Sequence, residues 1–379
     1  MSPTIWSYPT RILFGAGSAR LSGQEAKSFV SDRILLVTDP GVVSAGLTRA
    51  VEASLEAQGI RSQIFSELSS NPTEAEVEAG AEAYRSAGAQ GVVAVGGGAA
   101  MDVAKLIVVR SKVKEPFEQL DDARGGDRFI PRDLPPVIAV PTTAGTGSEV
   151  GRAAVLTVAS TGSKTVIFHP SMLPRVAILD PELSLSLPAG ATAATGFDAL
   201  THCLEAYLAK GDHPMADGIA LGGLEIIARD LLRAVRDGHD LDARGGMLKA
   251  AMMGAAAFQK GLGACHSLSH PLSAELGVHH GLANALCLPA VVDFNESVVP
   301  DRVKRVAAIF GAPAATGACA EALRKLRSAV GIASGLAQVG VTREQLPRLA
   351  ALAQSDACHH QNPRPCSERD FLALYTASL

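Results

Sequence analysis

The sequence predicts an α/β domain with a parallel sheet over residues 1–187 and an all-helical domain over residues 188–379. Three observations predict this organisation. The length of 379 residues exceeds what a single hydrophobic core usually serves. The first half alternates short apolar runs with amphipathic stretches, whereas the second half is rich in Ala and Leu and has long helical periodicity.

Four short apolar runs of the first half predict buried strands, at residues 33–38, 91–95, 136–140 and 176–179. Each run is followed by glycine, proline or aspartate, which are typical of turns. A helical pattern at residues 47–58 follows the first run, and this order is typical of a parallel sheet with helical crossovers. In the second half, the periodicity predicts helices over residues 192–209, 217–236 and 244–258.

The composition excludes several classes of protein. The formal net charge is -4 without a Lys/Arg block, and aromatic residues make up 4%, so a nucleic-acid partner is not expected. The six cysteines lack CxxC spacing and are expected to be reduced thiols. No apolar run of about 18–20 residues predicts a membrane span, and the first ten residues lack the features of a secretory signal. We therefore expect a cytoplasmic protein without a membrane partner.

Three consecutive glycines follow the predicted strand at 91–95. Gly96, Gly97 and Gly98 lack a Cβ, so the backbone can approach a pyrophosphate, and the N–H groups of a following helix can bind it. The same glycines are equally compatible with a tight turn. The earlier pair Gly15 and Gly17 shows no strand-to-helix frame, and we do not expect a phosphate site there.

Two further features lie where predicted strands end. Residues 141–149 combine hydroxyls and glycines, and ligands of open α/β sheets bind at this edge, although such clusters are also ordinary loops. Asp39 is placed to accept a hydrogen bond from a ribose hydroxyl and would repel a 2′-phosphate, which favours NAD over NADP. The alternative for Asp39 is a simple Asp-Pro-Gly turn.

A candidate metal site lies in the second half. Asp198 and His202 are four residues apart in a predicted helix and therefore share one face. Four of the ten histidines follow within fifteen residues: His266, His270, His279 and His280. His266 and His280 can bind one ion only if the chain turns between them, which Pro271 and Gly277 permit. An aspartate with imidazoles suits Fe²⁺ or Zn²⁺, but the residues alone leave open which histidines are ligands.

These motifs together resemble the iron-containing (group III) alcohol dehydrogenase family over nearly the whole chain, with residues 280–285, His-Gly-Leu-Ala-Asn-Ala, as a specific match. The resemblance implies metal ligands at Asp198, His202, His266 and His280, and an active-site role near the nicotinamide for His270. It also implies a set of NAD-binding positions, which are Asp39, Asn71, Gly97, Gly98, Ala99, Asp102, Thr142, Thr143, Thr146, Lys164 and Leu183. The family usually has Ser where this chain has Ala99, so one side-chain donor is absent while the backbone donors remain.

The resemblance implies a metal-dependent NAD oxidoreductase that interconverts a small primary alcohol, or hydroxy acid, and its aldehyde by hydride transfer. A homodimer is common in the family and is expected here. Arg152 is a candidate to receive an anionic end of the substrate; the alternative is a surface salt bridge.

Three other functions are weighed against this one. A maleylacetate-reductase-like enzyme would reduce a C=C bond, but Asp198 and the His280-Gly281 pair favour the alcohol dehydrogenase branch. A dehydroquinate-synthase-like lyase would need a basic cluster that the helical half lacks. A non-catalytic cofactor-binding assembly protein is disfavoured because all four ligand positions are filled.

Overall fold

The computed structural model describes residues 8, 10–160, 162 and 164–379, and most of the first ten residues therefore lie outside the described residues. The chain divides into two compact units. The α/β unit comprises Tyr8–Thr143 and Gly147–Ser186, and the helical unit comprises Ala144–Thr146 and Leu187–Leu379. No helix among the described residues is both long enough and apolar enough to cross a lipid bilayer.

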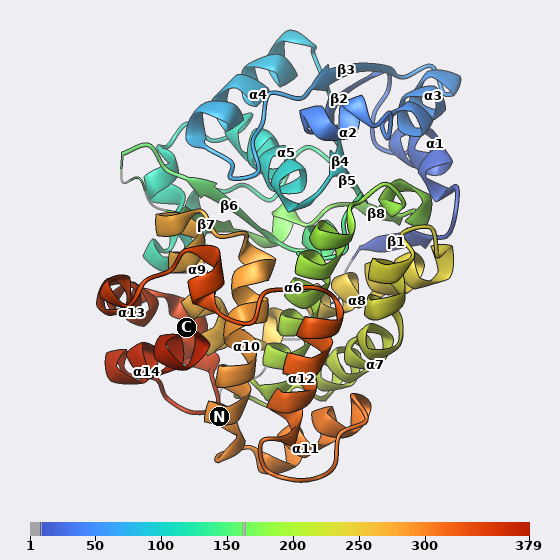
Figure 1. The fold of residues 1–379 in the computed structure, drawn as a ribbon. Coiled ribbons are helices and arrows are strands. Elements are labelled where there is room, and N and C mark those ends of the chain that lie inside the picture. The colour runs from blue at the N-terminus through green and yellow to red at the C-terminus, as the bar shows by residue number, and fades with distance from the viewer. Residues whose placement is uncertain (1–7, 9, 161, 163) are drawn as a thin grey trace. The chain divides into compact units, whose positions relative to one another are not determined.

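A six-stranded parallel sheet of strand order β1-β8-β5-β4-β2-β3 forms the centre of the α/β unit, beside an antiparallel β6-β7 ribbon (Figure 1). The strands are β1 Arg11–Phe14, β2 Arg33–Val37, β3 Arg61–Phe65, β4 Val92–Gly96, β5 Val137–Pro141, β6 Ala153–Thr157, β7 Lys164–Phe168 and β8 Val176–Leu179. The four strands predicted from apolar runs are confirmed as β2, β4, β5 and β8.

Helices cover both faces of this sheet. They are α1 Ser22–Lys27, α2 Pro40–Ser44, α3 Arg49–Ala57, α4 Glu74–Ser86 and α5 Gly98–Arg110. Because side chains alternate along a strand, Leu35 and Val92 join the core on the α4 and α5 side, whereas Ile34 and Val93 join the core on the α1 and α3 side. Both faces are therefore apolar, which explains why the central strands are continuous apolar runs.

Neither edge strand of the sheet was predicted from the sequence. Only Phe65 of β3 is buried, and no residue of β1 is buried. β3 therefore has no apolar run, and the apolar run of β1 is only three residues long, from Ile12 to Phe14. A strand therefore does precede Gly15, and a 3₁₀ turn at Ser18–Leu21 follows it, which corrects the expectation that no such frame exists.

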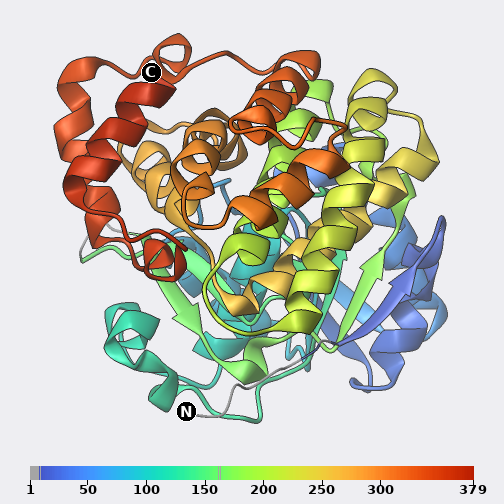
Figure 2. The ribbon, with the colours of Figure 1, turned by 90° about the horizontal axis from the view of Figure 1, so that it is seen from below.

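The helical unit contains nine α-helices within the described chain, drawn from green through yellow to red in Figure 2. They are α6 Ala189–Leu208, α7 Pro214–Arg236, α8 Leu241–Ala257, α9 Ala264–Leu276, α10 His280–Glu296, α11 Pro300–Ile309, α12 Ala318–Ala329, α13 Leu346–Ser355 and α14 Glu368–Ser378. The largely buried helix α6 packs against α7, α8 and α10. A Cβ on Gly196 would lie 2.2 Å from Leu231, so this glycine permits the close approach of α6 to α7.

Candidate metal centre and cofactor site

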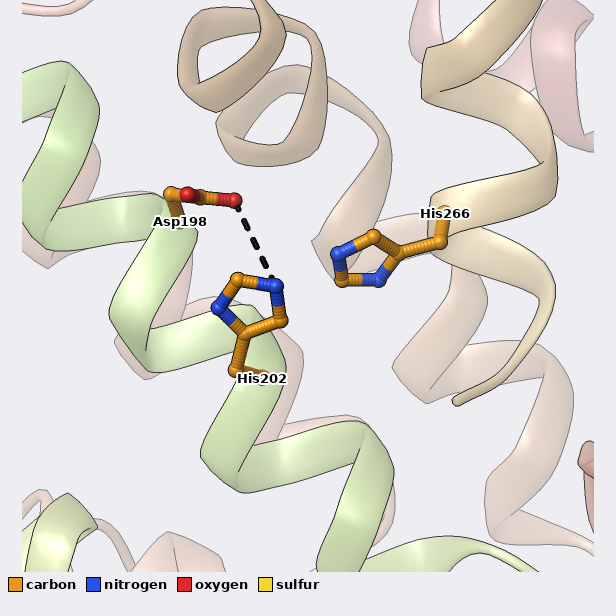
Figure 3. Close-up of side chains that lie close together, drawn as sticks. All are labelled: Asp198, His202 and His266. Carbon is orange, nitrogen blue, oxygen red and sulfur yellow. Dashed lines mark ion pairs between the residues drawn. The ribbon is translucent and has the colours of Figure 1, made fainter. Parts of the chain in front are cut away.

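Asp198 and His202 lie one turn apart on α6, and both side chains point toward His266 of α9 (Figure 3). His202 Nε2 lies 3.9 Å from Asp198 Oδ1. One donor atom each from Asp198, His202 and His266 lies within 4.8 Å of the other two. All three residues are buried, with at most 6% of their surface exposed. One carboxylate and two imidazoles therefore share a small interior space.

His280, the first residue of α10, contributes a third imidazole. Its Nε2 lies 3.4 Å from Asp198 Oδ1, and its ring lies 5.4 Å from the His266 ring. A Cβ on the next residue, Gly281, would lie 2.1 Å from the backbone oxygen of Ala194 on α6, so glycine is required where these helices meet. The neighbouring His279 is exposed.

The chain turns between α9 and α10 at Gly277, whose φ of 67° is left-handed. Pro271, the other residue considered for this turn, instead lies inside α9 and does not end it. Of the two residues, only Gly277 brings the segment carrying His280 back toward the segment carrying His266.

Neighbouring polar groups hold the cluster in place. The Glu205 carboxylate accepts from His266 Nδ1 at 2.6 Å and from the backbone N–H groups of Gly263 and Cys265 at 3.0 and 2.6 Å. The Asn284 amide donates to Asp198 Oδ1 at 2.9 Å. With Nδ1 occupied by Glu205, His266 Nε2 is buried without a hydrogen-bond partner among the described residues.

Burial and mutual charge set the protonation of this cluster. Burial alone raises the pKa of Asp198, but the surrounding imidazoles outweigh it and leave that pKa below its ordinary value. Burial lowers the pKa of His202 to about 4 and takes the pKa of His280 well below its ordinary value. Burial also opposes the charged form of His266, but the Glu205 carboxylate outweighs it and raises that pKa. At neutral pH an ionised carboxylate therefore faces the neutral imidazoles of His202 and His280, which are the forms that bind metal ions.

This donor set fits a divalent ion such as Fe²⁺ or Zn²⁺, since both accept imidazole and carboxylate ligands. The partnerless Nε2 of His266 supports this interpretation, because a buried polar atom without a partner is costly unless a ligand satisfies it. A carboxylate behind a histidine, as Glu205 stands behind His266, is also common around metal ions.

His270 lies one turn after His266 on α9, beside the cluster. Its ring stacks on the His280 ring at 5.4 Å, and its Nδ1 lies 2.7 Å from Asp356 Oδ2. The side chain is 36% exposed, so the ring is accessible in a way that the His266 ring is not.

In the α/β unit, the three glycines span the junction of β4 and α5. Gly96 has a φ of 156°, and a Cβ there would lie 2.8 Å from the Ala100 Cβ. Gly97 is the N-cap of α5, whose first turn begins with Gly98 and Ala99 and has no side-chain cap. A strand thus leads through glycine into a helix start with free N–H groups, an arrangement that favours a phosphate.

The other predicted cofactor positions near strand ends have different partners. Asp39 caps α2 by accepting from the Val42 N–H at 2.9 Å, so this acidic residue does begin a turn of helix. Lys164 Nζ donates to Asn71 Oδ1 at 3.0 Å, which pairs two predicted cofactor residues with each other. Burial lowers the pKa of Lys164.

Asp102 takes part in a buried polar network. Its carboxylate accepts from Ser148 Oγ at 2.7 Å and from the Val155 N–H at 3.1 Å. Lys105, fully buried on the same helix, donates to the Ser148 carbonyl and hydroxyl at 2.7 Å and to the Ala153 carbonyl at 3.0 Å. The network ties α5 to the segment that leads into β6.

The remaining predicted positions lie as follows. Thr142 is buried and its N–H donates to the Gly96 carbonyl, while Thr143 is half-buried. Thr146 belongs to the short segment that groups with the helical unit. The Leu183 side chain is buried in the core on the α1 and α3 side of the sheet.

The structure also bears on two other features of the sequence, the early glycine pair Gly15 and Gly17 and the side chain of Arg152. The Gly15 N–H donates to the Leu179 carbonyl, and the Gly17 N–H donates to the Asp180 carboxylate, so the early glycine pair uses its amides within the fold. The Arg152 guanidinium lies 5.6 Å from the Phe168 ring centre, and within the described residues it forms no ion pair with a carboxylate. The salt-bridge alternative for Arg152 is therefore not what the structure shows.

Glu205, Asn284 and Asp356 were not predicted from the sequence. Glu205 is seven residues after Asp198, and Asn284 is four after His280, so helical spacing alone had the information to find both. Asp356 carries no such signal, because it meets His270 only through the tertiary fold.

Comparison with known proteins identifies the family. The model described as iron-containing alcohol dehydrogenase matches residues 9–181, and the C-terminal model of the Fe-containing alcohol dehydrogenase family matches residues 192–379. The chain is 43% identical to 4-hydroxybutyrate dehydrogenase from Cupriavidus necator, over 98% of this chain and 99% of the relative.

Solved structures agree with the sequence comparison. A crystal structure of 1,3-propanediol oxidoreductase superposes with a TM-score of 0.95 and 33% identity, covering 99% of this chain and 100% of the other. Sulfoacetaldehyde reductase from Bifidobacterium kashiwanohense, solved with NAD⁺, gives a TM-score of 0.90 at 30% identity, covering 100% and 99%. These findings do not favour the maleylacetate-reductase-like or non-catalytic alternatives. The chain belongs to the iron-containing alcohol dehydrogenase family and is an NAD-dependent oxidoreductase of small alcohols that uses a metal ion.

Proposed function

We propose that Asp198, His202, His266 and His280 bind one divalent ion, and that this ion is the catalytic metal for interconverting a small primary alcohol and its aldehyde. The observation that carries the proposal is the convergence of one ionised carboxylate with the buried imidazoles of His202 and His266 and the half-buried imidazole of His280. We propose Fe²⁺ because the matching family is described as iron-containing. Zn²⁺ is the alternative, since carboxylate and imidazole ligands suit both ions.

An ion held there supplies Lewis-acid polarisation of the substrate oxygen, which makes the alcohol more acidic and the aldehyde more electrophilic. Asp198 contributes the negative charge of the ligand set, and Asn284 holds that carboxylate in place. Glu205 fixes the His266 tautomer with Nε2 free to bind. His270 would move the substrate proton, since a histidine side chain can act as a general acid and a general base.

Residues 1–187 would bind NAD, and residues 188–379 would bind the metal. The free N–H groups at Gly97, Gly98 and Ala99 would hold the pyrophosphate. Asp39, Asn71, Lys164 and the hydroxyls of Thr142, Thr143 and Thr146 would contact the rest of the cofactor, together with Asp102 and Leu183. Asp39 would favour NAD over NADP, because its carboxylate repels a 2′-phosphate.

The substrate we propose is an ω-hydroxy acid such as 4-hydroxybutyrate. Two observations support it: the 43% identity to a 4-hydroxybutyrate dehydrogenase, and an Arg152 guanidinium without a carboxylate partner within the described residues. A cation of this kind can receive the substrate carboxylate through two parallel hydrogen bonds.

A matched pair of substrates tests this assignment. The wild-type enzyme should have a higher kcat/KM for 4-hydroxybutyrate than for 1-butanol, in which a methyl group replaces the carboxylate. Arg152→Ala should raise KM for 4-hydroxybutyrate by about 10–100-fold and change KM for 1-butanol less than about 2-fold. Arg20→Ala, at an exposed arginine, is the control. Equal losses on both substrates would remove Arg152 from substrate binding.

The metal, the oligomeric state and the location are tested separately. Elemental analysis of protein purified without added metal should give about one equivalent of iron per chain. We also propose that the protein is a homodimer, which analytical sedimentation measures. We propose that it is located in the cytoplasm, which cell fractionation measures. Zinc alone in the active enzyme would reject iron, and a monomer at working concentration would reject the dimer.

A further inference from the structure

Asp356 uses its two carboxylate oxygens for different partners. It directly follows α13 and precedes the 3₁₀ turn Ala357–Gln361. Oδ1 accepts from Ser267 Oγ at 2.7 Å and from the Cys358 N–H at 2.8 Å. Oδ2 lies 2.7 Å from His270 Nδ1. One oxygen therefore fastens the turn to α9, and the other contacts the imidazole.

The contact leaves one nitrogen of His270 available. When Nδ1–H donates to a carboxylate, the neutral ring carries its lone pair on Nε2. The ring also lies against the proposed ligands, at 5.4 Å from the His280 ring and 5.9 Å from the His266 ring. The position of His270 beside the metal cluster is thus fixed by stacking, and its tautomer is fixed by Asp356.

We infer that Asp356 is a positioning residue for His270: it holds the imidazole in the Nδ1–H form with Nε2 directed to exchange the substrate proton. This inference rests on the proposed role of His270. Ser267 supports the carboxylate from α9, and the same hydroxyl accepts from the His359 N–H at 2.9 Å. The orienting carboxylate is therefore itself held from two segments.

The substitution Asp356→Asn separates the two halves of this contact. The amide oxygen can still accept from Ser267 and Cys358, so the turn is retained. The amide NH₂ group would then face His270 Nδ1 and donate to it, which places the ring proton on Nε2 and leaves no acceptor there. An analogous carboxylate-to-amide change in a serine protease triad acts through the wrong tautomer and costs about 10⁴-fold.

The experiment compares Asp356→Asn, His270→Ala and the double variant in the metal-loaded enzyme. Asp240→Asn is the matched control, because Asp240 also caps a helix with Oδ1 and pairs with Arg233 through Oδ2. We expect Asp356→Asn to lower kcat by about 100-fold or more while metal content, NADH affinity and melting temperature stay at the wild-type values. The double variant should be no slower than His270→Ala.

Several results would overturn the inference. A kcat of Asp356→Asn within about threefold of wild type would do so. So would a kcat that Asp356→Asn lowers by the same factor in the His270→Ala background as in the wild-type enzyme. A wild-type enzyme with two metal equivalents per chain and an Asp356→Asn variant with one would show that His270, Asp356 and Cys358 instead bind an ion. Full activity of His270→Ala would reject the proposed role of His270 and this inference with it. A slow His270→Ala with a fast Asp356→Asn would reject the inference alone.

Discussion

The proposed metal site and the proposed cofactor loop are built by different means. In the helical unit, side chains from α6, α9 and α10 converge, and Glu205 and Asn284 hold His266 and Asp198 from behind. In the α/β unit, the residues at 96–99 follow one another in the chain and offer mainly backbone N–H groups. A single side-chain change should therefore destroy the first site, whereas only an added Cβ or an altered backbone should damage the second.

The largest effect is expected from removing a proposed ligand. Asp198→Ala or His202→Ala should abolish metal retention and lower turnover by more than about 10³-fold, because the remaining buried donors no longer surround the ion. Elemental analysis and NADH absorbance measure the two losses in the same sample. Asp242→Ala, at an exposed position on α8, is the control. A metal-free variant with full activity would falsify the ligand assignment.

A smaller effect is expected at Glu205, which contacts the proposed ligand His266 but is not itself a proposed ligand. Glu205→Gln keeps the side-chain size but removes the negative charge that accepts from His266 Nδ1 and from two backbone N–H groups. Metal affinity should fall by about 10–100-fold, as measured by competition with a chelator. Glu225→Gln, at an exposed site on α7, should leave it unchanged. Unchanged affinity in Glu205→Gln would mean that the site does not depend on this support.

The contrast is sharpened by Gly97→Ala in the α/β unit. Gly97 has a φ of -82°, which alanine adopts freely, but the new Cβ would lie 3.3 Å from Thr143 Oγ1 in the proposed phosphate loop. NADH should bind about tenfold more weakly while metal content stays constant. Fluorescence titration of NADH measures this, with Gly218→Ala on α7, where a Cβ meets nothing within 4 Å, as the control. Loss of metal in Gly97→Ala would contradict the separation of the two sites.

The same contrast explains what the sequence predicted of the fold. Strands β2, β4, β5 and β8 were predicted because all of their residues except Arg33 are buried, whereas the edge strand β3 is mostly exposed and has no apolar run. Helices α7 and α8 begin three residues earlier than predicted, at Pro214 and Leu241. His213 and Asp240 cap these two helices. The spacing of apolar residues marks only the turns that pack against the core, so it misses the first turn after a cap.

Local spacing also limits what the sequence says about the candidate site. The four-residue spacing of Asp198 and His202 is enough to place them on one helix face, and the same rule applies to Glu205 and Asn284. Whether His266 and His280 meet depends on the turn at Gly277, which the sequence permits but does not require. The contact of Asp356 with His270 depends on how the segment after α13 packs on α9, and no local pattern encodes it.

The smallest effect on activity is expected at Glu149, next to the buried network of the α/β unit, where the change instead appears as a pH dependence of stability. Burial raises the pKa of Glu149 from 4.5 to about 7. Between these values the folded chain binds more protons than the unfolded chain, so the free energy of unfolding falls as the pH rises. Glu149→Gln removes this loss, so the difference in unfolding free energy between Glu149→Gln and wild type should be about 3 kcal/mol more in favour of the variant at about pH 7.5 than at about pH 4.5. Burial lowers the pKa of Lys105 from 10.5 to about 8, which acts with the opposite sign and only above that pH. Urea midpoints of both proteins at the two pH values measure the difference, and an equal offset at both would show that Glu149 does not titrate in this range.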